Sequence, residues 1–180
     1  MSIWLFGYGS IIWKTGFPFE ERRVAHIKDW SRRFWQASAD HRGTPDRPGR
    51  VVTLVPDGGA ACWGVAYRIA AEHVDDVMDQ LDYREKNGYS RMDLTLHLRD
   101  HGAVSGITYR ADEQNPWYLG PADDQAMARQ IAAAVGPSGT NKQYILELNR
   151  ALLANLIRDE HVENLHRLVT SQTEAINETD

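Results

Sequence analysis

The chain has 180 residues, a formal net charge of −5 and 42% hydrophobic residues, a composition typical of one globular domain. Lysine and arginine are scattered along it, so we expect neither a nucleic-acid nor an anionic-membrane partner. No apolar run approaches the length of a membrane span and no signal peptide is evident, so we expect a cytoplasmic protein that acts on a small molecule.

The first predicted element is a buried strand at residues 2–7, which leads into a glycine-containing loop. Gly7 and Gly9 can adopt positive φ, and such a loop can turn its backbone N–H groups toward an anion. A dinucleotide-binding loop is disfavoured because Ile12 stands where the third glycine of its fingerprint would be, and neither a phosphate loop nor a serine elbow follows. A plain turn without a ligand is the alternative.

Apolar segments predict five further strands, at residues 24–37, 50–55, 61–69, 90–98 and 103–110. Residues 40–49 contain two prolines and two glycines and predict a surface loop. The single cysteine, Cys62, lies in a predicted strand and is expected to be a buried core residue rather than a nucleophile. His97 and His101 lie four apart in a strand pattern that keeps them separate, and we expect no metal.

Three helices are predicted, at about 71–85, 123–134 and 141–158. The last of them places a set of core residues on one side: Tyr144, Leu148, Ala151, Leu152 and Leu156. We expect a single domain over residues 1–170 and a flexible tail over 171–180.

The helix predicted at 71–85 places an acid on its apolar face. Its inward positions follow helical spacing and are Val74, Val77, Met78 and Leu81. Glu85 continues this stripe just before Asn87-Gly88 end the helix. Burial and the negative end of the helix dipole both favour a carboxyl group that accepts a proton near neutral pH. The alternative is a plain ion pair with one of these residues: Arg84, Lys86, Arg32, Arg33, Arg42 or Arg50.

Eight segments, taken in order, resemble the ChaC family of glutathione-specific γ-glutamylcyclotransferases. They are Phe6-Gly7-Tyr8-Gly9-Ser10-Ile11-Ile12-Trp13, Ser31-Arg32-Arg33-Phe34-Trp35-Gln36, Asp40-His41-Arg42-Gly43, Pro48-Gly49-Arg50-Val51-Val52-Thr53-Leu54, Trp63-Gly64-Val65-Ala66-Tyr67-Arg68, Tyr83-Arg84-Glu85-Lys86-Asn87-Gly88-Tyr89, Tyr118-Leu119-Gly120-Pro121 and Gly136-Pro137-Ser138-Gly139. The resemblance covers residues 2–158 or so, and the order and spacing of its segments make it specific. One departure is Asn87-Gly88, where the family often has Gly-Gly.

The resemblance implies an α+β fold, a small mixed β-barrel of about six strands flanked by helices. It implies a lyase that cleaves glutathione to 5-oxoproline and Cys-Gly without a cofactor. Glu85 is then the catalytic acid/base, and the substrate-binding residues are Leu5, Phe6, Gly7, Tyr8, Gly9 and Ser10. We further expect Tyr118 and Tyr144 to shape the substrate pocket, and the chain to be a monomer.

Two other functions remain open from the residues. Ser10 could be the nucleophile of a hydrolase with His41 as base and Asp40 or another acid behind it, although the sequence neighbours Asp40 and His41 make a poor triad. The chain could also be a non-catalytic regulatory module that binds a γ-glutamyl metabolite through the glycine loop. Such a module would bind its ligand without turnover.

Overall fold

The computed structural model describes residues 1–85 and 88–177, with side chains up to residue 172. The chain divides into two compact units, one formed by Met1–Arg32 with Leu54–Pro116 and the other by Arg33–Thr53 with Trp117–Asp180. A single domain over 1–170 therefore stays a prediction. Lys86 and Asn87, at the predicted end of the first helix, lie outside the described residues, as do 178–180 of the predicted tail.

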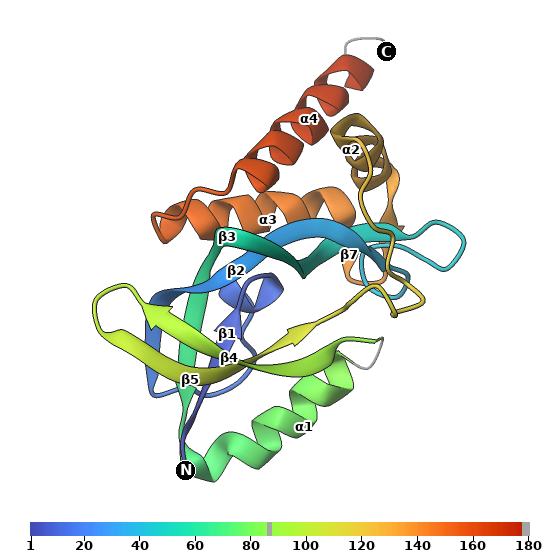
Figure 1. The fold of residues 1–180 in the computed structure, drawn as a ribbon. Coiled ribbons are helices and arrows are strands. Elements are labelled where there is room, and N and C mark those ends of the chain that lie inside the picture. The colour runs from blue at the N-terminus through green and yellow to red at the C-terminus, as the bar shows by residue number, and fades with distance from the viewer. Residues whose placement is uncertain (86–87, 178–180) are drawn as a thin grey trace. The chain divides into compact units, whose positions relative to one another are not determined.

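Five strands form a closed barrel in the order β1-β3-β2-β4-β5, which confirms the predicted α+β fold with a small mixed barrel (Figure 1). They are β1 (Ile3–Gly7), β2 (Glu21–Ser38), β3 (Gly49–Ile69), β4 (Ser90–Leu98) and β5 (Gly102–Arg110). The barrel is mixed because β1 runs antiparallel to β3 and parallel to β5. The large side chains that are buried in the first unit include Leu5, Phe6, Ile27, Leu54, Tyr67, Ile69 and Leu96.

The barrel has five strands rather than six because the predicted strands 50–55 and 61–69 are one strand, β3. The intervening Pro-Asp-Gly-Gly sequence is typical of a turn, but side chains of β2 support it in extended form. Asp29 Oδ1 accepts a hydrogen bond from Gly59 N–H at 2.8 Å, and Ser31 Oγ donates to Asp57 Oδ2 at 2.5 Å. Asp29 and Gly59 both have positive φ, so the strand continues through a local irregularity.

In the first unit, the helix α1 (Val74–Arg84) follows a short 3-10 turn, η2 (Ala71–His73). Of the predicted inward residues, Val77, Met78 and Leu81 are buried, which confirms the helical register. Figure 1 shows α1 beside the β4–β5 hairpin. Helix α1 contacts both strands of this hairpin through Asp82, whose carboxylate accepts from Tyr109 Oη and lies 3.4 Å from Arg91 Nη2.

The second unit contains three helices and a small two-stranded sheet. The elements are α2 (Asp124–Ala133), β6 (Val135–Gly136), β7 (Gly139–Thr140), α3 (Asn141–Ala154) and α4 (Glu160–Asn177). Each of the first two helices has a side-chain cap: Asp123 accepts a hydrogen bond from Ala126 N–H, and Thr140 accepts one from Gln143 N–H. Buried residues of this unit include Phe34, Ile131, Ile145, Leu148, Leu152, Val162 and Leu165.

Two features of the second unit differ from the prediction. Helix α3 ends at Ala154 rather than near 158, because Leu156 adopts φ 55° and leaves the helix, so its side chain is 83% exposed instead of buried. Helix α4 occupies residues 160–177, where no pattern was recognised, and it extends into the predicted tail. None of the described helices is long and apolar enough to cross a membrane.

A histidine pair lies between β2 and β4 in the first unit. His26 pairs with His97 across the ladder, with the two rings stacked 5.0 Å apart, and the His26 ring is 4.5 Å from that of Trp63. The buried Nδ1 of His26 has no hydrogen-bond partner among the described residues. Burial, with smaller contributions from His97 and Lys28, lowers the pKa of His26.

This lowered pKa predicts a loss of stability in mild acid. The unfolded chain takes up a proton on His26 near pH 6.5, whereas the folded chain does so only at lower pH. Neutral His26 therefore makes its full contribution to the free energy of unfolding above about pH 6.5. This contribution is lost as the pH falls through the folded pKa. We expect urea unfolding to give a smaller free energy at pH 5.5 than at pH 7.5, and His26→Phe to reduce that difference. His73→Gln is the control, because the His73 side chain is 45% exposed. An unchanged difference in His26→Phe would contradict the prediction.

Candidate active site

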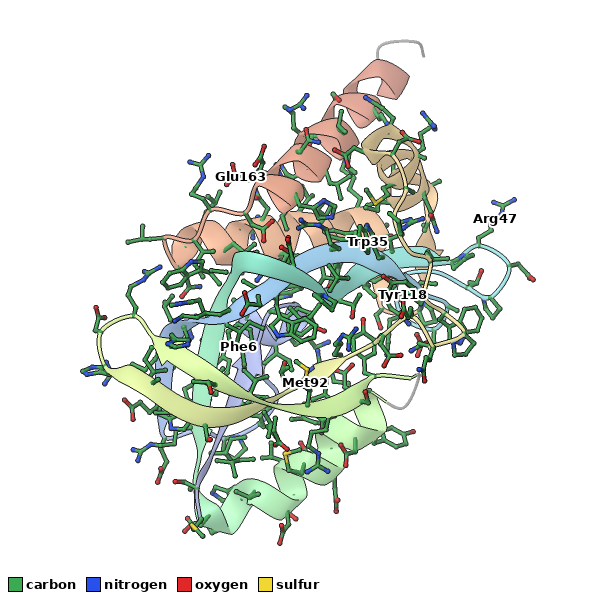
Figure 2. All side chains as sticks on the ribbon, viewed as in Figure 1. Phe6, Trp35, Arg47, Met92, Tyr118 and Glu163 are labelled. Carbon is green, nitrogen blue, oxygen red and sulfur yellow. The ribbon has the colours of Figure 1, made fainter. Side chains whose placement is uncertain are left out.

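Strand β1 carries the first half of the predicted substrate-binding segment, and this half belongs to the core. Leu5 and Phe6 lie within the strand with their side chains buried, and Figure 2 shows Phe6 inside the barrel. Thr108 Oγ1 donates a hydrogen bond to Phe6 O at 2.8 Å and so joins β1 to β5. The role of Leu5 and Phe6 in substrate binding stays a prediction, and their side chains serve the barrel.

The turn after β1 does not use the positive φ that its glycines permit. Gly9 has φ −125° and Gly7 has no positive φ. Gly7 is held extended by its pairing with Val65 of β3, and the chain then turns through a short 3-10 helix, η1 (Ser10–Ile12). Within residues 1–85 and 88–177, the backbone N–H of Gly9 donates to no acceptor.

Buried side chains fix Tyr8 at the start of this turn. Arg32, which is 1% exposed, donates from Nε to Tyr8 O at 2.6 Å and from Nη2 to Trp63 O at 2.5 Å. The Tyr8 hydroxyl donates to Tyr109 O on β5 at 2.7 Å. Both the backbone and the side chain of Tyr8 are therefore held, which gives the following residues a defined position.

Glu85 directly follows α1 and is directed inward, as predicted. Its backbone N–H donates to Leu81 O at 2.8 Å, which completes the last helical turn, and its side chain is 18% exposed. The helix therefore delivers a mostly buried carboxylate at its C-terminal end. Its neighbour Arg84 lies in the same unit and contacts both this carboxylate and the turn after β1.

Arg84 connects Glu85 to the turn after β1. Its Nη2 donates to Ser10 Oγ at 2.5 Å, its Nη1 donates to Lys14 O at 3.3 Å, and its Nε lies 3.6 Å from Glu85 Oε1. The ion pair that the sequence left open is thus present, but at a distance longer than a hydrogen bond. The two terminal nitrogens of the guanidinium bind the turn rather than the carboxylate.

A tyrosine on β5 faces the same region. Burial, chiefly, and the hydrogen bond to the Asp82 carboxylate raise the pKa of Tyr109, and the negative charge of Glu85 raises it further. The Glu85 carboxylate therefore acts electrostatically on the Tyr109 hydroxyl, while the Tyr109 carbonyl holds Tyr8. Glu85, β5 and the turn after β1 form one connected arrangement.

The chain leaves the Glu85 region through a constrained glycine. Gly88 has φ +99°, and a Cβ at this position would overlap the Asn115 amide, whose Nδ2 donates to Gly88 O at 2.6 Å. We expect Gly88→Ala to lower kcat several-fold and to lower the free energy of unfolding by about 1 to 2 kcal/mol. Steady-state kinetics and urea unfolding measure both effects. Gly16→Ala is the control, because Gly16 also has positive φ but no neighbour within 4 Å, and equal losses would contradict the role of Asn115.

The two other predicted substrate residues belong to the second unit. Tyr118 lies opposite Gln36 in an isolated antiparallel bridge flanked by hydrogen bonds from Ala37 N–H and Leu119 N–H, and Figure 2 labels Tyr118 and its neighbour Trp35. Tyr144 is buried on α3. Its ring packs edge-on against Phe34 and lies 5.8 Å from the Arg42 guanidinium. Their contact with a substrate stays a prediction.

Gln36 is a polar residue that the sequence analysis did not select. It is 1% exposed, and its Oε1 has no hydrogen-bond partner among the described residues. In the bridge with Tyr118 the two residues form a non-hydrogen-bonded pair, whose side chains lie close together on one face. The only sequence signal was a glutamine in an otherwise apolar stretch of a buried strand.

Ser10 and His41, two groups of the alternative serine hydrolase, each have another hydrogen-bonding neighbour. Ser10 Oγ accepts a hydrogen bond from Arg84, a side chain that cannot act as a base. His41 Nδ1 lies 3.2 Å from Ser138 Oγ and its Nε2 lies 3.4 Å from Asp40. Cys62 is buried, as predicted, and the part of the chain that the structure describes contains no cluster of three or more potential metal ligands among His, Cys, Asp and Glu.

A family model described as ChaC-like protein matches residues 3–172, nearly the whole chain. The chain belongs to the ChaC-like family. The relatives of this ChaC-like protein include mouse glutathione-specific gamma-glutamylcyclotransferase 1, which is 40% identical over 168 residues, 90% of this chain and 75% of the mouse protein. Gamma-glutamylcyclotransferase 2-3 of Arabidopsis thaliana is 44% identical over 174 residues, 92% of this chain and 87% of the plant protein.

The fold of the ChaC-like protein matches that of a solved relative. The crystal structure of the yeast gamma-glutamyl cyclotransferase specific to glutathione superposes with a TM-score of 0.90 at 30% identity, covering 94% of this chain and 96% of the yeast chain. The match confirms the fold and the family predicted from the sequence segments.

The sequence analysis of the ChaC-like protein missed what holds Glu85 and the turn in place. Arg32 and Arg84 were considered only as ion-pair partners for Glu85. Strand alternation gives the face that a residue occupies but not its hydrogen-bond acceptor, and both arginines donate to groups more than 20 residues away in the sequence. An arginine within an apolar strand is the signal that could have identified Arg32.

Proposed function

We propose that the chain is a glutathione-specific γ-glutamylcyclotransferase that cleaves glutathione to 5-oxoproline and Cys-Gly. The observation that carries the proposal is the inward carboxylate of Glu85, connected through Arg84 to Ser10 at the end of β1. This arrangement occurs in a chain that is 40% identical over 167 residues to human glutathione-specific gamma-glutamylcyclotransferase 1. The mostly buried Glu85 side chain suits a proton carrier.

In the proposed reaction the substrate supplies its own nucleophile. The α-amine of the γ-glutamyl group attacks the γ-carbonyl, so a new C–N bond closes the five-membered lactam as the amide bond to the cysteinyl nitrogen breaks. Glu85 accepts the proton that the attacking amine loses and returns it to the departing nitrogen. Protons and electrons balance within glutathione, and no water, metal or redox cofactor takes part.

The turn after β1 assists by binding the substrate in a folded conformation. Bringing the α-amine to the γ-carbonyl requires a bent γ-glutamyl chain, and fixing that bend removes much of the entropic barrier. The N–H of Gly9, which has no acceptor among the described residues, is available to the substrate carboxylate or to the developing oxyanion. The fixed position of Tyr8 keeps this donor in place.

The remaining parts of the proposal concern location, assembly and pocket. A cytoplasmic protein suits this substrate, because the cytosol maintains a glutathione pool. We take the active species to be a monomer, which size-exclusion chromatography with light scattering tests. Tyr118 and Tyr144 are retained as substrate-binding residues.

Product analysis of the wild-type protein with glutathione tests the proposal. We expect equal amounts of 5-oxoproline and Cys-Gly. Glutamate in place of 5-oxoproline, together with inactivity of Ser10→Ala and activity of Glu85→Gln, would support the serine hydrolase instead. Binding of glutathione without any product would support the regulatory module.

A further inference from the structure

Arg84 and Glu85 are neighbours in sequence, yet their charged groups approach each other. Successive residues on a helix point in different directions, so an adjacent pair does not normally interact. Here Glu85 lies just beyond the last helical residue, with φ −93° and ψ 9°, and this change of backbone brings its Oε1 to 3.6 Å from Arg84 Nε. The contact is therefore a product of the local helix end.

The other nitrogens of Arg84 determine where this contact is held. Nη2 donates to the Ser10 hydroxyl and Nη1 to the Lys14 carbonyl, both on the turn after β1. A guanidinium is a rigid planar fork, so two hydrogen bonds on one edge fix the direction of the third nitrogen. The turn that is proposed to bind the substrate therefore sets the position of Nε, the nitrogen of the Arg84 guanidinium that faces Glu85.

We propose that Arg84 is a positioning residue, which holds the Glu85 carboxylate in register with the substrate-binding turn and keeps it ionised before the substrate binds. This inference rests on the proposed function. It assigns roles to Arg84 and to the Ser10 hydroxyl that the proposed function does not include. Burial disfavours a charged carboxyl group, whereas a cation within 4 Å favours it. A base must be deprotonated to accept the proton of the attacking amine, so Arg84 maintains the reactive form.

The proposed role of Arg84 also accounts for the long distance between Arg84 Nε and Glu85 Oε1. A short bidentate arginine–carboxylate pair would hold both carboxylate oxygens and oppose proton transfer to them. At 3.6 Å through a single nitrogen, the cation acts on Glu85 by its field. The hydrogen bonds of the fork are used on Ser10 and Lys14 instead.

The test compares Arg84→Met, which removes the charge and the donors, with Arg84→Lys, which keeps the charge without the fork. In Arg84→Met we expect kcat to fall about 10- to 100-fold with KM changed less than about threefold. The acidic limb of the pH profile of kcat/KM should move up by about half to one pH unit. Arg84→Lys should restore this limb while kcat stays low. Ser10→Ala should lower kcat in the wild type and have little further effect in Arg84→Met.

A readout without turnover separates this inference from the proposed function. In protein labelled with ¹³C at glutamate carboxyls, the Glu85 resonance is assigned by its absence in Glu85→Gln, and its titration is followed by NMR. We expect Glu85 to titrate at higher pH in Arg84→Met than in the wild type. The matched control is Arg150→Met, which removes an arginine that also lies 3.6 Å from a glutamate but is 76% exposed.

The outcomes are distinct. A titration of Glu85 that is unchanged in Arg84→Met, or a loss of kcat that merely follows a loss of thermal stability with no shift of the acidic limb, overturns the role of Arg84. A wild type that fails to cleave glutathione overturns the proposed function, and the Glu85 titration still decides whether Arg84 controls its ionisation. A shift of the Glu85 titration in Arg84→Met, with no shift of the Glu85 titration in Arg150→Met, supports the role of Arg84.

Discussion

Glu85→Gln is expected to reduce turnover of glutathione by about 100- to 10,000-fold, the range in which a positioned acid/base contributes to catalysis. Glutamine keeps the size and hydrogen-bonding capacity of the side chain but can neither accept nor return the proton. Because glutamine preserves the shape of the glutamate side chain, which is 18% exposed, we expect the free energy of unfolding to change by less than about 1 kcal/mol. Release of 5-oxoproline under single-turnover conditions measures the first effect, and urea unfolding the second.

The control for this variant is Glu72→Gln, which makes the same substitution at a side chain that is 80% exposed in the turn preceding α1. It should retain wild-type activity. The proposed role of Glu85 would be contradicted by a folded Glu85→Gln protein with more than about a tenth of wild-type kcat, because general acid/base catalysis contributes more than that.

Gly64→Ala is expected to cause a large loss of stability. Gly64 lies on β3 where β1 passes close to it, and a Cβ at this position would overlap Gly7 O and lie 2.8 Å from Phe6 Cζ. Backbone cannot move aside as a flexible side chain does, so β1 must shift in the barrel. We expect the free energy of unfolding to fall by about 3 kcal/mol, at the upper end for overpacking. Urea unfolding followed by circular dichroism measures the change.

The same substitution should also lower activity, because the displaced residue Gly7 leads directly into the turn after β1. Gly58→Ala is the matched control: Gly58 lies on the same strand, has no positive φ, and a Cβ there would meet no atom within 4 Å. We expect Gly58→Ala to unfold at the same urea concentration as the wild type or at a slightly higher one. Equal destabilisation by the two substitutions would show that the approach of β1 to β3 is not the cause.

Periodicity in the sequence predicted that Glu85 faces inward, because α1 has a clear apolar stripe and the acid falls on it. Its catalytic role came from the resemblance to the ChaC family and stays a prediction. The buried Val77, Met78 and Leu81 confirm the register on which that prediction depended. The barrel itself was predicted from the resemblance to the ChaC family, since strand segments alone do not determine their order or closure.

Interactions between distant residues limited the rest of the prediction. Support from Asp29 and Ser31 on β2 keeps a turn-like sequence of β3 extended, so two predicted strands are one. Pairing with β3 holds Gly7 extended, although glycine also permits positive φ. The hydrogen-bond acceptors of Arg32 and Arg84 are determined by the folded chain, because they lie on other elements.

Turnover of glutathione in water enriched in ¹⁸O tests the central claim most directly. If the α-amine of the substrate closes the ring while Glu85 carries the proton, no water enters the product, and mass spectrometry should find 5-oxoproline without heavy oxygen beside an equal amount of Cys-Gly. Glutamate that has gained one ¹⁸O atom would show that water or a serine ester intermediate cleaves the bond, and would contradict this account.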